Sequence, residues 1–168
     1  MDTTNTNEQI LNLDLSSTAK KKVVVNGNEN DAFYINTSDF GIYGRLQDGV
    51  KKLYDLLITM RERLKDVSES EDVDENNEEQ TDAFDTKLTN VMKDTDAEMR
   101  SIVDGIFNAP VSDICAPDGY MFDMFEGQLR FEYIISAITK LYENNINAEF
   151  YKIKSRINSK LPSYAKKK

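Results

Sequence analysis

The sequence predicts an α+β fold that is mainly α, with an N-terminal β-hairpin packed on three to four helices. Near the N-terminus, two β-branched and aromatic runs flank an Asn-Gly pair. Further along, apolar residues recur at steps of three and four over several long segments, the spacing of amphipathic helices. Between the first two of these segments lies an acidic stretch, which we expect to be a flexible linker. The length of 168 residues favours a single domain.

The hairpin is predicted from its turn chemistry. The runs Lys22–Val25 and Ala32–Ile35 lie on either side of Asn26 and Gly27. Asn-Gly readily adopts the positive φ values of a tight hairpin turn. An isolated hairpin is only marginally stable in water, so this one must pack on the helices. Upstream, the stretch Leu11–Leu15 alternates leucine with polar residues, as a half-buried strand does.

The first helix is predicted to follow Thr37–Asp39, whose side chains offer N-cap oxygens, and to end near Lys65. Three glycines interrupt this segment, and each costs about 1 kcal/mol relative to alanine inside a helix. Either the first turns are irregular, or another part of the chain approaches closely there. The glycines are Gly41, Gly44 and Gly49, and the apolar stripe comprises Ile42, Leu46, Val50, Leu53, Leu57, Met60 and Leu64.

The acidic linker is expected over residues 66–82. This stretch contains no lysine or arginine, and like charges at such density repel one another. Asp72, Asp74 and Asn76 match the first ligand positions of a calcium-binding loop. However, Asn77 and Ala83 stand where that loop needs glycine and glutamate, so we predict no metal site. The carboxylates are those of Asp66, Glu69, Glu71, Asp72, Asp74, Glu75, Glu78, Glu79 and Asp82.

Two further helices are predicted on either side of a compact elbow, Asn108–Gly119. The second helix carries apolar residues from Phe84 to Ile106 and ends at Asn108–Pro110. Ser112–Cys115 is a candidate short helical turn, and Pro117–Gly119 has turn chemistry. A third helix is predicted from about Tyr120 to Tyr142. It is apolar over so wide an arc that it either lies at the centre of the fold or binds a partner through one face. Its apolar residues are Phe122, Phe125, Leu129, Tyr133, Ile134, Ala137, Ile138 and Leu141.

A basic C-terminal segment is expected after an interruption at Asn144 and Asn145. Ile146, Phe150, Ile153 and Ile157 follow at helical spacing, and no acid occurs after Glu149. This segment has the charge to bind nucleic acid or an anionic membrane, or to pair with the acidic linker. The net charge of −9 opposes steering towards a polyanion, so neither nucleic acid nor a membrane is the expected partner. The expected basic surface comprises Lys152, Lys154, Arg156 and Lys160.

These segments define the expected domain organisation and location. We expect a disordered N-terminus over residues 1–9, a single helical domain over residues 10–145 and a basic helix and tail over residues 146–168. The one cysteine, the acidic N-terminus and the lack of an apolar run of about 20 residues favour a cytoplasmic protein.

No catalytic or cofactor-binding pattern is present in the sequence. The chain has no histidine, which removes the commonest general base and metal ligand, and Cys115 is expected to be a small buried residue without a base partner. The glycines at 41, 44 and 49 lack the Gly-Lys-Ser/Thr of a phosphate-binding loop. Three acids near the predicted third helix have a structural interpretation as partners of its N-terminus. They are Asp118, Asp123 and Glu126. We therefore predict no catalytic residues, no metal, no cofactor and no enzymatic activity.

The order of elements from Val23 to Tyr142 resembles the small tail assembly chaperone-like proteins of phages that infect Gram-positive bacteria. In that family the second helix commonly ends in Phe-Gly before a short polar turn and a hydrophobic closing residue. Here Ile106, Phe107 and Asn108 correspond to the helix end, with asparagine in place of the usual glycine, and Ser112–Cys115 to the turn.

The resemblance implies a non-enzymatic role in which the protein binds the long helical tape-measure protein, or another tail protein, before the tail tube forms. It implies the host cytoplasm as the place of action. A groove for the partner is then expected along the third predicted helix, since an amphipathic client needs an apolar surface to cover it. The expected partner-binding residues are Phe122, Phe125, Leu129, Tyr133 and Ile134.

Two other classes of protein stay open. A structural virion component, such as a connector or head–tail accessory protein, would share this order of elements, would form a homo-oligomer and would remain in the virion. An acidic inhibitor that mimics nucleic acid would bind its target through the carboxylates of residues 66–82.

Overall fold

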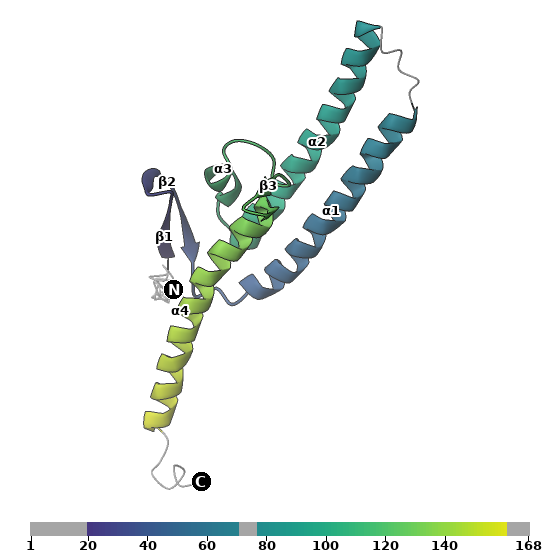
Figure 1. Ribbon diagram of the computed structural model, residues 1–168. Coiled ribbons are helices and arrows are strands. Elements are labelled where there is room, and N and C mark those ends of the chain that lie inside the picture. Colours follow the sequence, from purple (N-terminus) through teal and green to yellow (C-terminus); the bar gives the residue numbers. More distant parts are fainter. Residues whose placement is uncertain (1–19, 71–76, 161–168) are drawn as a thin grey trace, which may run out of the picture.

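The computed structural model describes residues 20–70 and 77–160 (Figure 1). A β-hairpin precedes the helices, and this confirms the predicted mainly helical α+β class. The elements in chain order are β1 (Lys20–Val25), β2 (Asn28–Asn36), α1 (Ile42–Ser70), α2 (Glu78–Phe107), α3 (Val111–Cys115), β3 (Met124–Phe125), β4 (Gln128–Leu129) and α4 (Arg130–Lys160).

The hairpin of β1 and β2 is antiparallel, as predicted. Its register runs from Lys20 opposite Asn36 to Val24 opposite Ala32, with an irregularity before the turn. Asn26 and Gly27 adopt positive φ values of 51° and 72°, which is why this pair closes the hairpin. Residues 1–19, which include the expected strand Leu11–Leu15 and the polar N-terminus, lie outside the described part of the chain.

Helices α1 and α2 lie side by side and antiparallel (Figure 1). Gly49 explains part of their packing, because a Cβ atom there would lie only 2.6 Å from the side chain of Ile106 on α2. The close approach considered for the glycines is therefore real at Gly49, whereas a Cβ at Gly44 would meet nothing within 4 Å. Ile42 and Leu53 of the predicted stripe are buried, and Leu46, Val50 and Leu57 pack against the core.

The expected linker over residues 66–82 is too long. Helix α1 continues past Lys65 to Ser70, where Lys65 pairs with Glu69 at 3.5 Å across one helical turn. Helix α2 already begins at Glu78, because the Asn77 side chain accepts a hydrogen bond from Gln80 N. Local helical contacts thus outweigh charge repulsion at both ends. Residues 71–76 lie outside the described part of the chain, and they include Asp72, Asp74 and Asn76, the three matches to a calcium-binding loop.

The third predicted helix starts ten residues too early. Helix α4 begins at Arg130, and the small antiparallel pair of β3 and β4 precedes it. Between these strands Glu126 and Gly127 have φ values of 50° and 79°, a left-handed turn that no helix accommodates. The predicted interruption at Asn144 and Asn145 is also wrong, since α4 runs without a break to Lys160. Asparagine costs a helix only about 0.7 kcal/mol, too little to end it.

The core lies where α4 crosses the end of the α1 and α2 pair and meets the hairpin (Figure 1). Phe131 of α4 packs edge-on against Tyr54 of α1, with ring centroids 5.6 Å apart, and Tyr142 lies 6.2 Å from Phe107 of α2. The C-terminal part of α4 extends away from the other elements (Figure 1). The main buried side chains are Phe33, Ile35, Ile42, Leu53, Met99, Val103, Ile106, Phe107, Met121, Phe131, Ile134, Ile138 and Tyr142.

Candidate partner-binding groove

Arg100 holds the elbow between α2 and α4 in place. Its Nε donates to Asp96 Oδ2 at 2.6 Å, while its two terminal nitrogens donate to the carbonyl oxygens of Ala116 at 3.0 Å and Gly119 at 2.8 Å. Burial alone would lower the pKa of Arg100, but Asp96 and Asp113 raise it overall. The guanidinium therefore stays charged and holds the elbow, at Ala116 and Gly119, to one point of α2.

A further carboxylate, that of Asp104, and the second oxygen of Asp96 also hold the elbow in place. Asp104 accepts from the backbone N–H of Ser112 at 2.7 Å and from its hydroxyl at 3.0 Å. Asp96 uses its second oxygen to accept from Met121 N at 2.6 Å, although it is itself buried. Asn108 ends α2 in the left-handed conformation, with φ 51°. The elbow is thus rigid enough to form one wall of a site.

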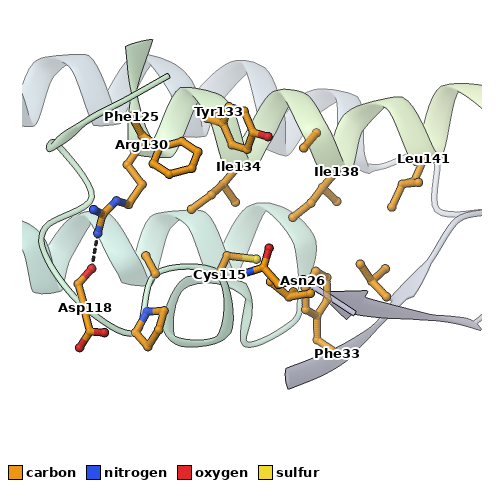
Figure 2. Close-up of a pocket in the computed structure, with 15 residues that line it drawn as sticks. Asn26, Phe33, Cys115, Asp118, Phe125, Arg130, Tyr133, Ile134, Ile138 and Leu141 are labelled. Carbon is orange, nitrogen blue, oxygen red and sulfur yellow. Dashed lines mark hydrogen bonds between the residues drawn. The ribbon is translucent and has the colours of Figure 1, made fainter. Parts of the chain in front are cut away.

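An apolar groove of about 420 Å³ lies between the hairpin, the elbow and α4 (Figure 2). Val23 and Val25 of β1 are half-buried and form one wall together with Phe33 of β2, while Val24 between them faces outward. Ile134 and Ile138 of α4 point into the space from the opposite wall (Figure 2). The other lining residues are Asn26, Cys115, Ala116, Pro117, Asp118, Phe125, Arg130, Tyr133, Ala137 and Leu141.

The groove continues along α4 into a second hollow of about 510 Å³. Val23 and Leu141 line both spaces, so the two hollows adjoin. Lys21 and Lys22 of β1 line the second hollow, as do residues of β2. On α4 the lining residues of the two hollows include a series at alternating steps of four and three, which is the heptad spacing of helix-to-helix seams. This heptad stripe comprises Arg130, Ile134, Ala137, Leu141, Asn144 and Ala148.

The five predicted partner-binding residues divide into two groups. Phe125, Tyr133 and Ile134 line the groove, and the rings of Phe125 and Tyr133 pack edge-on with centroids 4.8 Å apart. Phe125 and Tyr133 are 41% and 40% exposed, so both remain accessible at the rim. Phe122 instead stacks on Tyr120 at 5.0 Å, and Leu129 packs against the core. Neither of these two lines the groove.

Sequence reasoning missed the wall opposite α4. Val23, Val25 and Phe33 were assigned only to the hairpin, and Cys115 only to the elbow. The sequence carries no signal for this wall, because residues 23–25 are all valine and the alternation of half-buried Val23 and Val25 with exposed Val24 is seen only in the structure.

Cys115 is half-buried in this wall, which fits the prediction of a small apolar role in part. Burial, with a smaller contribution from Asp104, raises the pKa of its thiol to about 11. The thiol is therefore protonated at neutral pH and a poor nucleophile.

The three acids near the elbow do not converge on one point. Asp123 forms an ion pair with Arg130 at 3.6 Å and accepts from Tyr120 N at 2.7 Å. Arg130 also donates to the backbone carbonyl of Asp118 (Figure 2). Glu126 occupies the exposed turn between β3 and β4. The expectation that these acids lie at a helix N-terminus is wrong, because α4 begins only after them.

The structure bears on three further expectations: the basic surface, a metal site and a membrane-spanning helix. Lys152, Lys154, Arg156 and Lys160 lie in the C-terminal part of α4, and their side chains are outside the described part. Among the described residues, no cluster of three or more acids and cysteine is arranged to hold a metal ion. Within the same part of the chain, no helix is long and apolar enough to cross a membrane.

Comparison of this chain with models of known protein families, with curated proteins and with solved structures finds no match.

Proposed function

We propose that this protein binds an amphipathic helix of another protein in the groove between β1, the elbow and α4. The observation that carries the proposal is the heptad stripe on α4, which lines both hollows together with β1 and, in the first hollow, the elbow. Four of its six residues, Ile134, Ala137, Leu141 and Ala148, are apolar, and apolar residues at this spacing are typical of a surface that receives a helix. Tyr133, Leu141 and Phe125 give the groove an exposed apolar rim.

Within this class, we propose the role of a tail assembly chaperone that acts in the host cytoplasm and binds the helical tape-measure protein. The resemblance in the order of elements and at Ile106–Asn108 supports this choice of partner. A long amphipathic helix exposes apolar surface before the tail tube forms around it, and a groove of this kind would cover part of that surface. The chain itself would not carry out a reaction.

Co-expression with a tape-measure fragment tests the proposal. Size-exclusion chromatography with light scattering should show one complex of defined mass that survives moderate salt. Ala137→Arg should abolish the complex, because this exposed alanine lines the middle of the groove. The matched control Ser136→Arg places the same side chain on the neighbouring exposed residue, which does not line the groove, and should leave binding intact.

A double variant tests the rim. Phe125→Ala with Tyr133→Ala should remove binding while the helical circular dichroism signal stays unchanged, since both rings are partly exposed. A collapse of helicity would show that the two rings are core residues. Absence of a complex, together with a discrete homo-oligomer of the chain alone, would favour a structural virion component. Absence of a complex with a monomeric chain would favour the acidic inhibitor.

A further inference from the structure

The second hollow of the groove reaches the outer edge of β1, which is the edge that faces away from β2. Four consecutive residues of β1, Lys21–Val24, line this hollow. Successive side chains of a strand point to opposite faces, so a space lined by all four extends beside the strand and not only over one face. Among the described strands, β1 pairs with β2 alone. Alternate residues of β1 point their backbone N–H and C=O groups away from β2, so a further strand can add at this edge.

The two hollows together have the length of a short strand. β1 has six residues and spans about 20 Å at 3.3 Å per residue. On α4 the lining residues from Ile134 to Ala148 span about 21 Å at 1.5 Å per residue. An extended segment of about six residues, laid between β1 and α4, would therefore cover both hollows.

The chain carries a segment of this kind shortly before β1. In the stretch Leu11–Leu15, leucine alternates with polar residues, the pattern of a strand with one apolar face. Leu15 is five residues before Lys20, the first residue of β1, so these two residues lie at most about 18 Å apart. A tether this short holds the segment near the groove at an effective concentration in the millimolar range. A protein from solution has no such tether, which makes this segment the favoured occupant.

We propose that Leu11–Leu15 adds to the outer edge of β1 as a third antiparallel strand and covers the groove with its leucines. The register follows from the faces of the two strands. Val23 and Val25 line the first hollow, and residues that lie opposite each other share a face. Leu13 then lies opposite Val23 and Leu11 opposite Val25, with a connection of five residues.

A partner helix would have to displace this strand, because both would occupy the space between β1 and α4. This consequence rests on the proposed function, whereas the strand itself does not. The groove would then bind only a partner that competes with a tethered strand, and weak apolar contacts with unrelated proteins would be excluded.

Hydrogen exchange followed by NMR on the full chain tests the third strand. In the wild type, the β1 amides that point away from β2 should exchange about tenfold more slowly than exposed amides, or slower still. Leu11→Asp with Leu13→Asp should remove this protection, because burying a carboxylate against valine is costly. The control, Asn12→Asp with Ser16→Asp, adds the same charge at two polar positions and should keep the protection. Circular dichroism checks that all variants keep their helices.

Two results would overturn the third strand. One is rapid exchange of all outward-pointing β1 amides in the wild type, and the other is equal protection in both double variants. Light scattering separates a strand from the same chain from one exchanged between copies. Protection in a monomer supports the proposal, and a dimer that loses protection on dilution overturns it.

Affinity for the tape-measure fragment separates this inference from the proposed function. If both hold, Leu11→Asp with Leu13→Asp should bind the fragment about tenfold tighter than the wild type, as measured by fluorescence anisotropy. Protected β1 amides without any binding of the fragment would keep the third strand and overturn the proposed partner. Unprotected amides with equal affinity in both proteins would do the reverse. Protected amides with equal affinity would show that the fragment binds outside the groove.

Discussion

At Gly49 the absence of a side chain lets Ile106 of α2 lie directly against the backbone of α1. A Cβ atom there would approach two side-chain carbons of Ile106 to 2.6 Å, and Ile106 is itself buried. Substitution by alanine therefore forces two packed helices apart, and overpacking of this kind typically costs about 1–3 kcal/mol.

Gly49→Ala should lower the free energy of unfolding by about 1–2 kcal/mol, even though alanine favours a helix. Gly44→Ala is the matched control on the same helix, because a Cβ there meets nothing within 4 Å. It should raise stability by about 0.5–1 kcal/mol. Urea unfolding followed by circular dichroism measures both. Equal effects at the two positions would contradict the packing account.

Arg100→Lys should destabilise the protein by about 2–4 kcal/mol. A lysine ammonium cannot reach Asp96, Ala116 and Gly119 at once, so the part-buried carbonyl of Ala116 or the exposed carbonyl of Gly119 would lose its donor. The control is Arg61→Lys on α1, an exposed position at which we expect no change. If Arg100→Lys lowers the free energy of unfolding by less than about 0.5 kcal/mol, the usual effect of a surface substitution, then the elbow is held by its apolar contacts alone.

At the scale of elements, the start of α4 depends on the turn before it. Glu126 adopts φ 50°, a conformation that costs glutamate more than it costs asparagine or glycine. Asp123 O accepts from Arg130 N at 2.8 Å, and Met121 O accepts from Phe131 N at 2.9 Å, so this short hairpin folds back on the first residues of the helix.

Glu126→Asn should raise the free energy of unfolding by about 0.5–1 kcal/mol, because Asn-Gly is the preferred pair for this turn. Gly127→Ala should lower it by about 1–2 kcal/mol through backbone strain alone, since its φ is 79° and a Cβ would meet nothing within 4 Å. Thermal unfolding monitored at 222 nm compares the two variants. Stabilisation by both would mean that the turn is not left-handed in solution.

At the scale of the molecule, charge is separated along the long dimension. The described carboxylates Asp66, Glu69, Glu78, Glu79 and Asp82 lie where α1 ends and α2 begins. The C-terminal end of α4, with the basic residues of the sequence, lies at the opposite end of the molecule (Figure 1). In the described part of the chain, the C-terminal end of α4 and these carboxylates therefore do not lie side by side, while residues 71–76 and 161–168 lie outside that part.

The whole protein should lose stability in alkaline solution. Burial raises the pKa of the Cys115 thiol to about 11 and also raises the pKa of Tyr142. A hydrogen bond to Glu132 raises the pKa of Tyr54. A group with a raised pKa stabilises the folded state below its unfolded pKa, about 8.5 for cysteine and 10 for tyrosine, and this contribution is lost as the pH rises through the folded value.

Urea unfolding between pH 7 and 11 should show constant stability up to about pH 8 and a decline above it. Cys115→Ala removes the group that titrates first in the unfolded state, so the decline should then begin nearer pH 10. The same onset in both proteins would contradict the assignment to Cys115.

The elements whose ends depend on local chemistry follow from the sequence alone. Asn26 and Gly27 closed the hairpin, and Asn108 ended α2, because a left-handed turn or cap depends on the residue that adopts it. The sequence also determined the mainly helical class, since the spacing of apolar residues records which face each helix buries.

The first residue of α4 and the residues that face this helix depend on how the elements pack in three dimensions. Phe122, Phe125, Leu129 and Tyr133 fit helical spacing equally well on a helix or on a short hairpin leading into one, so periodicity could not place Arg130 as the first helical residue. The groove brings Val23, Cys115 and Ile138 together from distant parts of the chain. Such contacts depend on how elements pack, and no local spacing encodes that.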